Sequence, residues 1–230
     1  MAVSLATEAA LWAAGVRLVA GMDEVGRGAL AGPVSVGVVA VAPCDGWPRG
    51  LADSKELSAE RREEIALALA GFGVAHAVGS ATSDEVDAVG IVGALRLAGL
   101  RALRALSRQG VEPDRVLLDG HHDWLTSPPA TLWEGAGSGE RVPPVTTIVK
   151  GDGLCASIAA ASVLAKVARD AEMVAAHGAH PAYGWRDNKG YGSADHLEAI
   201  ARLGPTPLHR VSWNLPPRSR DGGSEGMMGA

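Results

Sequence analysis

Three aspartates stand where strands are expected to end, and they are the residues best suited to chemistry in this sequence. Asp23, Asp119 and Asp152 each end or closely follow a short alternating or apolar segment. Ligands of α/β proteins gather at strand ends, and carboxylate oxygens are the ligands that Mg²⁺ and Mn²⁺ prefer. Without a cation, converging carboxylates would repel one another. The pattern therefore predicts a site for Mg²⁺ or Mn²⁺.

Such a cluster indicates hydrolysis of a phosphodiester. Two divalent cations about 3.5–4 Å apart can clamp the attacking and leaving oxygens of an in-line phosphoryl displacement. No group of histidines and cysteines has the spacing of a zinc site, and we interpret His121, His122, His177 and His180 as surface residues. The chemistry predicted from the residues alone is that of a metal-dependent nuclease.

Glu24 directly follows Asp23 and poses a geometric question. Successive side chains of a strand point to opposite faces of the sheet, so both acids reach one site only if the strand bends or if Glu24 also binds through its backbone carbonyl. The alternative is that Glu24 pairs with Arg27. We retain Glu24 as a fourth expected ligand.

The elements that must position these acids form an α/β pattern. We expect strands over Val16–Met22, Val34–Val41, Val74–Ala81, Val116–Asp119 and Val145–Val149, and helices over Leu5–Ala14, 58–70, Ile91–Gln109, Leu154–Ala176 and Ser193–Leu203. Turn-like or loop segments are expected over Asp23–Pro33, 43–57 and 120–144. The first three strands have short connections and could be antiparallel, whereas later strands alternate with helices. The expected fold is a mixed sheet flanked by helices.

Composition narrows the class of protein. The chain has 230 residues, 47% of them hydrophobic and 20% charged, which suits one large domain with a core. Cys44 and Cys155 lie far apart, which suits a reducing compartment without disulfides. We see no membrane span or signal peptide and expect a cytoplasmic protein. The net charge of −5 is unusual for a nucleic-acid binder, but cations bound at clustered acids would reverse the local sign.

A glycine pattern offers a competing interpretation. Gly26-x-Gly28-x-x-Ala31 after a strand resembles a dinucleotide-binding fingerprint, which would indicate a nicotinamide-dependent oxidoreductase. The context disagrees, because acids precede the glycines and a strand, not a helix, follows them. These glycines more readily let the backbone approach a sugar and a phosphate. A non-catalytic nucleic-acid-binding protein is the other alternative, although all four acids are present.

Six blocks of sequence, in order, resemble type 2 ribonuclease H, the bacterial ribonuclease HII family, over about Leu11 to Trp213. They are Gly21-Met-Asp-Glu-Val-Gly-Arg-Gly28, Asp53-Ser-Lys-Glu-Leu-Ser58, Leu118-Asp-Gly120, Lys150-Gly-Asp152 with Ser157 to Asp170, Tyr183-Gly-Trp185 with Asn188-Lys-Gly-Tyr-Gly192, and His209-Arg210 with Ser212-Trp213. A set of six is far more specific than any one block.

The resemblance implies a ribonuclease H-like fold over residues 1–215, with a helical C-terminal portion over about 153–215. The composition of residues 216–230, rich in Pro, Arg, Gly and Ser, predicts a disordered tail. It implies the quartet Asp23, Glu24, Asp119 and Asp152 with Mg²⁺ or Mn²⁺. It implies cleavage on the 5′ side of ribonucleotides in RNA–DNA hybrids and at single ribonucleotides in duplex DNA, leaving 3′-hydroxyl and 5′-phosphate ends. It also implies a role in ribonucleotide excision repair. We separately expect a monomer in the cytoplasm.

The resemblance also implies residues that read the substrate. Gly26, Arg27, Gly28 and Tyr191 are expected to recognise the ribonucleotide, whose 2′-hydroxyl separates RNA from DNA. We take Lys55, Lys166 and Ser157 as candidate phosphate contacts. The alternatives are an exposed loop lysine for Lys55 and a packing serine for Ser157.

Overall fold

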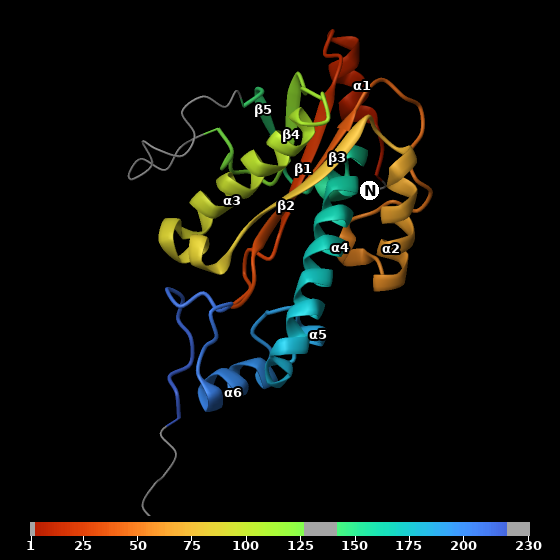
Figure 1. Ribbon diagram of the computed structural model, residues 1–230. Coiled ribbons are helices and arrows are strands. Elements are labelled where there is room, and N and C mark those ends of the chain that lie inside the picture. The colour runs from red at the N-terminus through yellow and green to blue at the C-terminus, as the bar shows by residue number, and fades with distance from the viewer. Residues whose placement is uncertain (1–2, 127–141, 220–230) are drawn as a thin grey trace, which may run out of the picture.

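A computed structural model describes residues 3–126 and 142–219. Figure 1 shows one central sheet with helices on both faces. The strands are β1 (Val19–Val25), β2 (Val34–Val41), β3 (Ala75–Ala81), β4 (Arg115–Asp119) and β5 (Val145–Ile148). The helices are α1 (Ala6–Ala13), α2 (Ala59–Ala68), α3 (Ser83–Ser107), α4 (Ala156–Ala179), α5 (Trp185–Asn188) and α6 (Ala194–Leu203). The predicted mixed sheet flanked by helices is confirmed.

The sheet has the strand order β3-β2-β1-β4-β5. β1 pairs antiparallel with β2, and β2 pairs antiparallel with β3, as the short connections suggested. β1 pairs parallel with β4, and β4 pairs parallel with β5. The register sets Met22 opposite Leu118, so the next residues, Asp23 and Asp119, lie side by side on neighbouring strands.

Two apolar cores lie on the two faces of the sheet. On one face, α3 packs over β2 and β3. The core on this face includes the buried residues Met22, Val36 and Leu95. On the other face, α4 packs over β1 and β2, and α2 packs against α4. Asp23 follows Gly21 by two residues on β1 and therefore shares the face that α4 covers.

Small residues let α4 approach the sheet closely. A Cβ atom on Gly21 would lie 2.2 Å from the backbone carbon of Ser157, and one on Gly37 would lie 2.2 Å from the carbonyl oxygen of Ala161. Both distances are below any contact that real side chains make, so these positions need glycine. The close approach brings the segment that precedes α4, which carries Asp152, beside β1.

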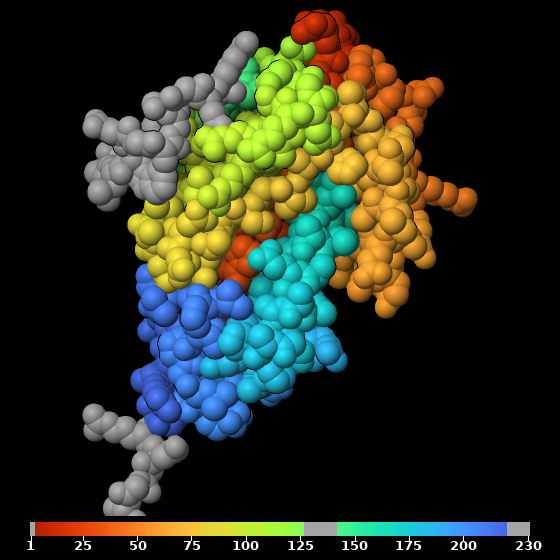
Figure 2. Space-filling model, viewed as in Figure 1, coloured from red at the N-terminus to blue at the C-terminus, as the bar shows by residue number. Residues whose placement is uncertain are grey.

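The C-terminal portion packs beneath the sheet as an extension of α4. Figure 1 shows α5 and α6 gathered around the far end of α4, and the segment that follows α6 beside the first turns of α3. Figure 2 shows the same C-terminal residues, in blue, directly below the start of α3. Asp87 of α3 holds the segment that follows α6, since its carboxylate accepts hydrogen bonds from the amides of Val211 (2.8 Å) and Ser212 (3.0 Å). Although α3 and α4 are long, no helix in the described part of the chain is both long and apolar enough to cross a membrane.

Several predicted boundaries were wrong. β1 runs to Val25 rather than Met22, so Asp23 and Glu24 lie inside the strand and not in a turn. α3 begins at Ser83 rather than Ile91, because Thr82 and Glu85 form a capping box at its start. Gly90, with φ 71°, interrupts that helix. The glycine led the sequence prediction to start the helix after it and to miss the turns over residues 83–89.

Other predictions were confirmed or lie outside the description. The predicted helices over 58–70 and Ser193–Leu203 are present as α2 and α6, and the hydroxyl groups of Ser58 and Ser193 cap them. Cys44 and Cys155 are both free. Most of the predicted 120–144 loop (127–141) and most of the predicted disordered tail (220–230) fall outside the described residues. Of the tail, Ser219 is described and donates its amide to the carbonyl of Ala201.

Candidate active site

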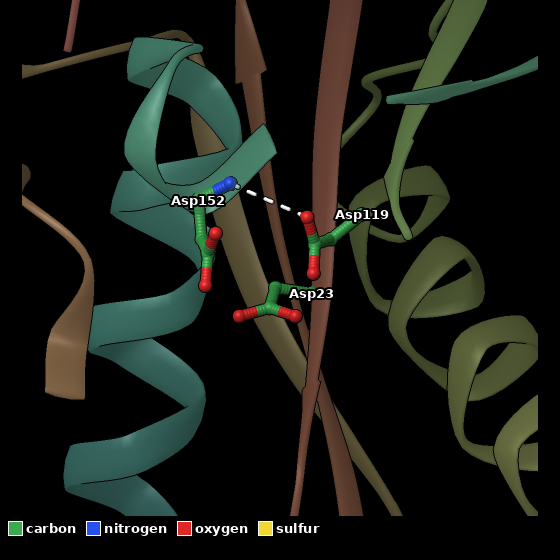
Figure 3. A group of neighbouring side chains, drawn as sticks. All are labelled: Asp23, Asp119 and Asp152. Carbon is green, nitrogen blue, oxygen red and sulfur yellow. Dashed lines mark hydrogen bonds between the residues drawn. The ribbon is translucent and has the colours of Figure 1, made fainter. Parts of the chain in front are cut away.

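Three aspartates from three separate segments converge at one edge of the sheet. Asp23 lies on β1, Asp119 ends β4, and Asp152 lies in the 3-10 turn Gly151–Gly153 that leads into α4. One carboxylate oxygen of each lies within 4.8 Å of the others, and Figure 3 shows the three side chains directed toward one another. The structure therefore brings together the three acids expected at strand ends.

Backbone amides hold two of these carboxylates. Asp119 Oδ1 accepts hydrogen bonds from the amides of Gly151 (2.7 Å) and Asp152 (3.4 Å), and the second of these is drawn in Figure 3. Asp23 Oδ1 accepts a hydrogen bond from the amide of Glu24 at 2.8 Å. Lys150, immediately before the 3-10 turn, has a left-handed backbone with φ 57°. This tight turn lets its amides reach back to the end of β4.

Burial and mutual repulsion make the cluster costly without a cation. Asp23 is 4% exposed and Asp152 is 6% exposed. Burial raises the pKa of Asp23 well above its ordinary value, and the charges of Asp119 and Glu24 raise it further. Burial and the charge of Asp152 likewise raise the pKa of Asp119. The arrangement disfavours the ionised acids and would be stabilised by positive charge.

Lys55 supplies one positive charge beside the cluster. Its ammonium lies 3.1 Å from Asp152 Oδ2 and 3.8 Å from Asp53 Oδ1. Burial opposes the charge on Lys55, but the hydrogen bond and charge of Asp152 outweigh it and raise the pKa of Lys55. Ser162 on α4 donates a hydrogen bond to Ser54 Oγ at 2.7 Å, which fastens the segment that carries Lys55.

Glu24 lies at the margin of the cluster rather than among its members. The register of β1 turns it toward the α3 face, opposite to Asp23. Its carboxylate lies 3.4 Å from the guanidinium of Arg27, the alternative partner considered for it. Burial raises the pKa of Glu24, Arg27 lowers it, and Asp119 raises it. Glu24 therefore feels the charge of Asp119 while it is paired with Arg27.

The expected substrate-reading residues lie on two neighbouring segments. Gly26, Arg27 and Gly28 follow β1, and the amides of Leu30 and Ala31 next to them donate to the carbonyl of Gly190 (2.8 and 3.2 Å). Tyr191, which follows Gly190, is 37% exposed. These hydrogen bonds join residues 26–33, the glycine loop, to residues 189–192, the tyrosine turn.

The two remaining candidates are placed differently. Lys166 lies on α4, where its ammonium contacts Asp170 Oδ1 at 2.8 Å. Ser157 is fully buried, and its hydroxyl donates to Glu8 Oε1 at 2.6 Å. The prediction that Ser157 contacts phosphate is corrected, because its hydroxyl is buried and bonded to the carboxylate of Glu8 on α1, where a phosphate cannot reach it.

Two arginines that sequence reasoning missed hold the glycine loop from within. Arg169 and Arg210 are fully buried, and both donate to backbone carbonyls of residues 26–33. Both stand inside the sequence blocks described above, but a charged residue in a helix or loop is ordinarily expected to be solvated. Only the folded contacts show that they point inward.

The competing dinucleotide interpretation is wrong. Gly26 and Gly28 connect two antiparallel strands, β1 and β2, and no helix follows them. A dinucleotide-binding unit needs a helix whose N-terminus faces the pyrophosphate.

Comparisons with known proteins agree with the geometry. The family model described as Ribonuclease HII matches residues 20–215. Ribonuclease HII of Streptomyces avermitilis is 46% identical over 199 residues, which cover 86% of this chain and 78% of the relative. Ribonuclease HII of Cereibacter sphaeroides strain KD131 is 46% identical over 209 residues, which cover 90% of this chain and 88% of the relative.

Solved structures share the fold at lower identity. Ribonuclease H2 from Pyrococcus horikoshii matches with a TM-score of 0.61 and 24% identity, over 86% of this chain and 94% of that one. A structure of Bst-RNase HIII in complex with Mn²⁺ matches with a TM-score of 0.57 and 19% identity, over 86% of this chain and 68% of that one. Taken with the convergent aspartates, the family match establishes that this chain belongs to the ribonuclease HII family of metal-dependent endoribonucleases.

Proposed function

We propose that this chain hydrolyses the phosphodiester on the 5′ side of ribonucleotides, both in RNA–DNA hybrids and at single ribonucleotides embedded in duplex DNA. The products would carry 3′-hydroxyl and 5′-phosphate ends. The observation that carries the proposal is the convergence of Asp23, Asp119 and Asp152 within 4.8 Å, on a fold shared with ribonucleases H2 and HIII.

The residues present fit divalent cations. Three carboxylates offer only oxygen ligands, which suits Mg²⁺ or Mn²⁺ rather than zinc, and the raised pKa of Asp23 and Asp119 indicates a deficit of positive charge. We propose that Asp23, Asp119 and Asp152 hold two such ions, with Glu24 completing the set. Bound there, the ions would neutralise the scissile phosphate and acidify the attacking water.

The chain's own residues would place the substrate. Asp23, from the centre of the sheet, faces both other acids and with them would hold the positive charge that attracts the scissile phosphate. Lys55, which contacts Asp152 at 3.1 Å, would meet a phosphate oxygen when substrate enters. For Lys166 we retain a weaker proposal of phosphate contact, since its ammonium is already paired with Asp170.

Recognition of the ribonucleotide is assigned to the glycine loop and Tyr191. Arg27 and Gly28 are exposed, and a Cβ atom on Gly28 would meet no atom within 4 Å, so the loop backbone is open to a ligand. Backbone groups and the Tyr191 hydroxyl can both bond a 2′-hydroxyl, which DNA lacks. The Tyr191 ring can also stack on a neighbouring sugar.

The wider setting belongs to the same proposal. We propose that residues 1–215 act as one catalytic unit, as a monomer, in the cytoplasm, in the removal of ribonucleotides from DNA. Sedimentation or size-exclusion chromatography at micromolar concentration tests the monomer, and a dimer of constant mass would contradict it.

Product analysis tests the proposed reaction. A duplex of labelled RNA paired with DNA is incubated with the protein and Mg²⁺ or Mn²⁺, and the fragments are treated with polynucleotide kinase or with a phosphatase. The proposal predicts 5′-phosphate fragments that resist kinase until dephosphorylated. Fragments that end in 2′,3′-cyclic phosphate would contradict it, because they arise when the substrate's own 2′-hydroxyl attacks.

A further inference from the structure

We infer that Arg169 and Arg210 are positioning residues that determine how well the enzyme distinguishes a ribonucleotide from a deoxynucleotide. The inference rests on the proposed function and adds a pair of buried cations to it. Neither residue touches substrate in this account. Both act through the loop and turn that do.

Arg210 holds both ends of the glycine loop. Its guanidinium donates to the carbonyls of Gly26 (2.8 Å), Arg27 (3.0 Å) and Gly32 (3.0 Å). One planar group thus fixes both ends of the loop that connects β1 to β2, in a geometry that the fork of a guanidinium matches and an ammonium does not. The group also lies 4.9 Å from the centre of the Trp213 ring.

Arg169 joins the loop to the tyrosine turn. Its guanidinium donates to Pro33 (2.8 Å) and Ala31 (3.1 Å) on the loop side, and to Lys189 (3.0 Å) on the turn side. The same group lies 5.4 Å from the centre of the Tyr191 ring. Lys189 has a left-handed backbone with φ 51°, which a residue with a side chain adopts only at a cost. The bond from Arg169 helps to hold it.

The inward carbonyls leave the amides of the loop free. When a guanidinium takes the carbonyls of Gly26 and Arg27, the peptide groups are oriented with their amides away from it. Among the described residues, the amides of Arg27 and Gly28 donate no hydrogen bond to the protein, and both residues are exposed. Two unused donors on an ordered backbone suit a sugar hydroxyl or a phosphate oxygen.

The burial of these arginines calls for a reason beyond stability. Within the described chain neither guanidinium lies near enough to a carboxylate to form an ion pair, so the two buried charges are met by carbonyl dipoles and aromatic rings. Burial lowers the pKa of both, that of Arg210 to about 10. Buried charges are expensive, and in some proteins they are retained because they specify one arrangement. Here the specified arrangement is the surface expected to read the sugar.

The test separates recognition of the ribonucleotide from general binding of the duplex. In the full-length enzyme with Mg²⁺, KM is measured for a duplex with one ribonucleotide, and KI is measured for the all-DNA duplex of the same sequence as a competitive inhibitor. The ratio of KI to KM reports discrimination. Arg169→Lys and Arg210→Lys keep the charge but lose the fork, and each is expected to lower this ratio about tenfold while KI stays within twofold, since a hydrogen bond to the 2′-hydroxyl is weakened.

A matched control and a second variant keep the inference testable. Arg101→Lys alters a half-buried arginine that bonds Glu85 and the carbonyl of Ser80, away from the loop, and is expected to leave the ratio unchanged. If either lysine variant fails to fold by circular dichroism, Trp213→Leu removes the ring beneath Arg210 and is expected to lower the ratio as well.

Three outcomes are distinguishable. A wild-type enzyme with no preference for the ribonucleotide would contradict the proposed function itself. A wild-type preference that survives in folded Arg169→Lys and Arg210→Lys, or in Trp213→Leu when it must replace them, would overturn only the present inference. An equal rise of KM and KI would also overturn it, because that pattern reports a general loss of structure rather than a loss of reading.

Discussion

At the scale of single residues, Asp23 concentrates the electrostatic conflict of the site. It is 4% exposed, and burial together with the charges of Asp119 and Glu24 raises its pKa. An acid whose pKa is higher in the folded than in the unfolded state contributes stability at low pH. That contribution is lost as the pH rises through the folded pKa. At neutral pH and without metal, Asp23 therefore destabilises the fold that it serves.

Replacing Asp23 with asparagine should separate stability from activity. In chelator at pH 7, Asp23→Asn removes a repelled charge and should raise the melting temperature by roughly 2–4 °C, the shift that about 1 kcal/mol produces in a domain of this size. With Mg²⁺, cleavage should fall by roughly 100-fold or more, because loss of a ligand exceeds the 10–100-fold cost of losing an outer partner.

Asp45→Asn, at an exposed loop position, is the control and should change neither quantity. A lower melting temperature of Asp23→Asn in chelator would show that Asp23 stabilises the metal-free fold. Unreduced cleavage would remove it from the proposed set of ligands.

Replacing Lys55 tests the proposed phosphate contact. Lys55→Met keeps an unbranched side chain of similar length and removes its charge. KM for a duplex with one ribonucleotide should therefore rise about tenfold with a smaller change in kcat, as expected when a charged hydrogen bond is lost. Arg17→Met is the control, since Arg17 is an exposed cation paired with Asp114 before the start of β1. An unchanged KM in Lys55→Met would assign Lys55 to the ion pair with Asp152 alone.

Residue types predicted the cluster of acids better than they predicted individual contacts. Asp119 and Asp152 could be found because they follow predicted strands, and the ends of strands are where α/β folds gather their ligands. Ser157 could not be placed, because its partner Glu8 lies 149 positions away in sequence. Arg169 and Arg210 were missed for a similar reason, since local sequence does not show that a charge will be buried on carbonyl groups.

At the scale of elements, the contact of α4 with β1 and β2 decides where Asp152 lies. The glycines at positions 21 and 37 admit the helix backbone, since a Cβ atom added at either position would lie 2.2 Å from a backbone atom of α4. The strands and helices themselves were largely predictable from their patterns. The early start of α3 could not be predicted, because Gly90 breaks the helix and separates its first turns from the longer part that was predicted.

Gly21→Ala should move α4 away from β1. Overpacking of this kind costs about 1–3 kcal/mol, so the midpoint of urea unfolding should fall, and the affinity for Mn²⁺ should fall with it as Asp152 is displaced. Gly46→Ala is the control, because a Cβ there would meet no atom within 4 Å and the backbone has an ordinary φ. Stability equal to that of the wild type in Gly21→Ala would refute this account of the helix contact.

The C-terminal portion contains a buried histidine pair that should make its stability depend on pH. His196 Nε2 and His209 Nε2 lie 3.1 Å apart, and His209 Nδ1 accepts a hydrogen bond from the amide of Thr206. Burial, followed by the charges of His196 and His180, lowers the pKa of His209 to about 4. A histidine with a depressed pKa binds more protons when unfolded, so stability present above about pH 6.5 is lost as the pH falls toward 4.

A neutral replacement should flatten this dependence. The free energy of unfolding of the wild type should fall between pH 7 and pH 5, and His209→Gln should show a shallower decline, because its amide can bond but does not titrate. His76→Gln, at an exposed position on β3, should retain the wild-type slope. Equal slopes in wild type and His209→Gln would mean that other groups govern the dependence.

At the scale of the whole molecule, strand order and chain connection explain how distant acids meet. β1 lies between β2 and β4 although the chain visits β2 and β3 before β4, so Asp23 and Asp119 become neighbours across 96 positions. The sequence indicated a mixed sheet but not this order, because the register of parallel strands depends on long-range packing. A net charge of −5 is compatible with a nucleic-acid enzyme here, since three of the acids are gathered in one cluster that could hold a cation.

Cleavage of one defined duplex tests the central claim most directly. An end-labelled DNA duplex with a single ribonucleotide and its all-DNA counterpart are incubated with the protein in Mg²⁺, in Mn²⁺ or in chelator. The account predicts one cut, on the 5′ side of the ribonucleotide, only when a divalent metal is present. Cleavage in chelator, cleavage of the all-DNA duplex, or no cut by folded protein with either metal would contradict it.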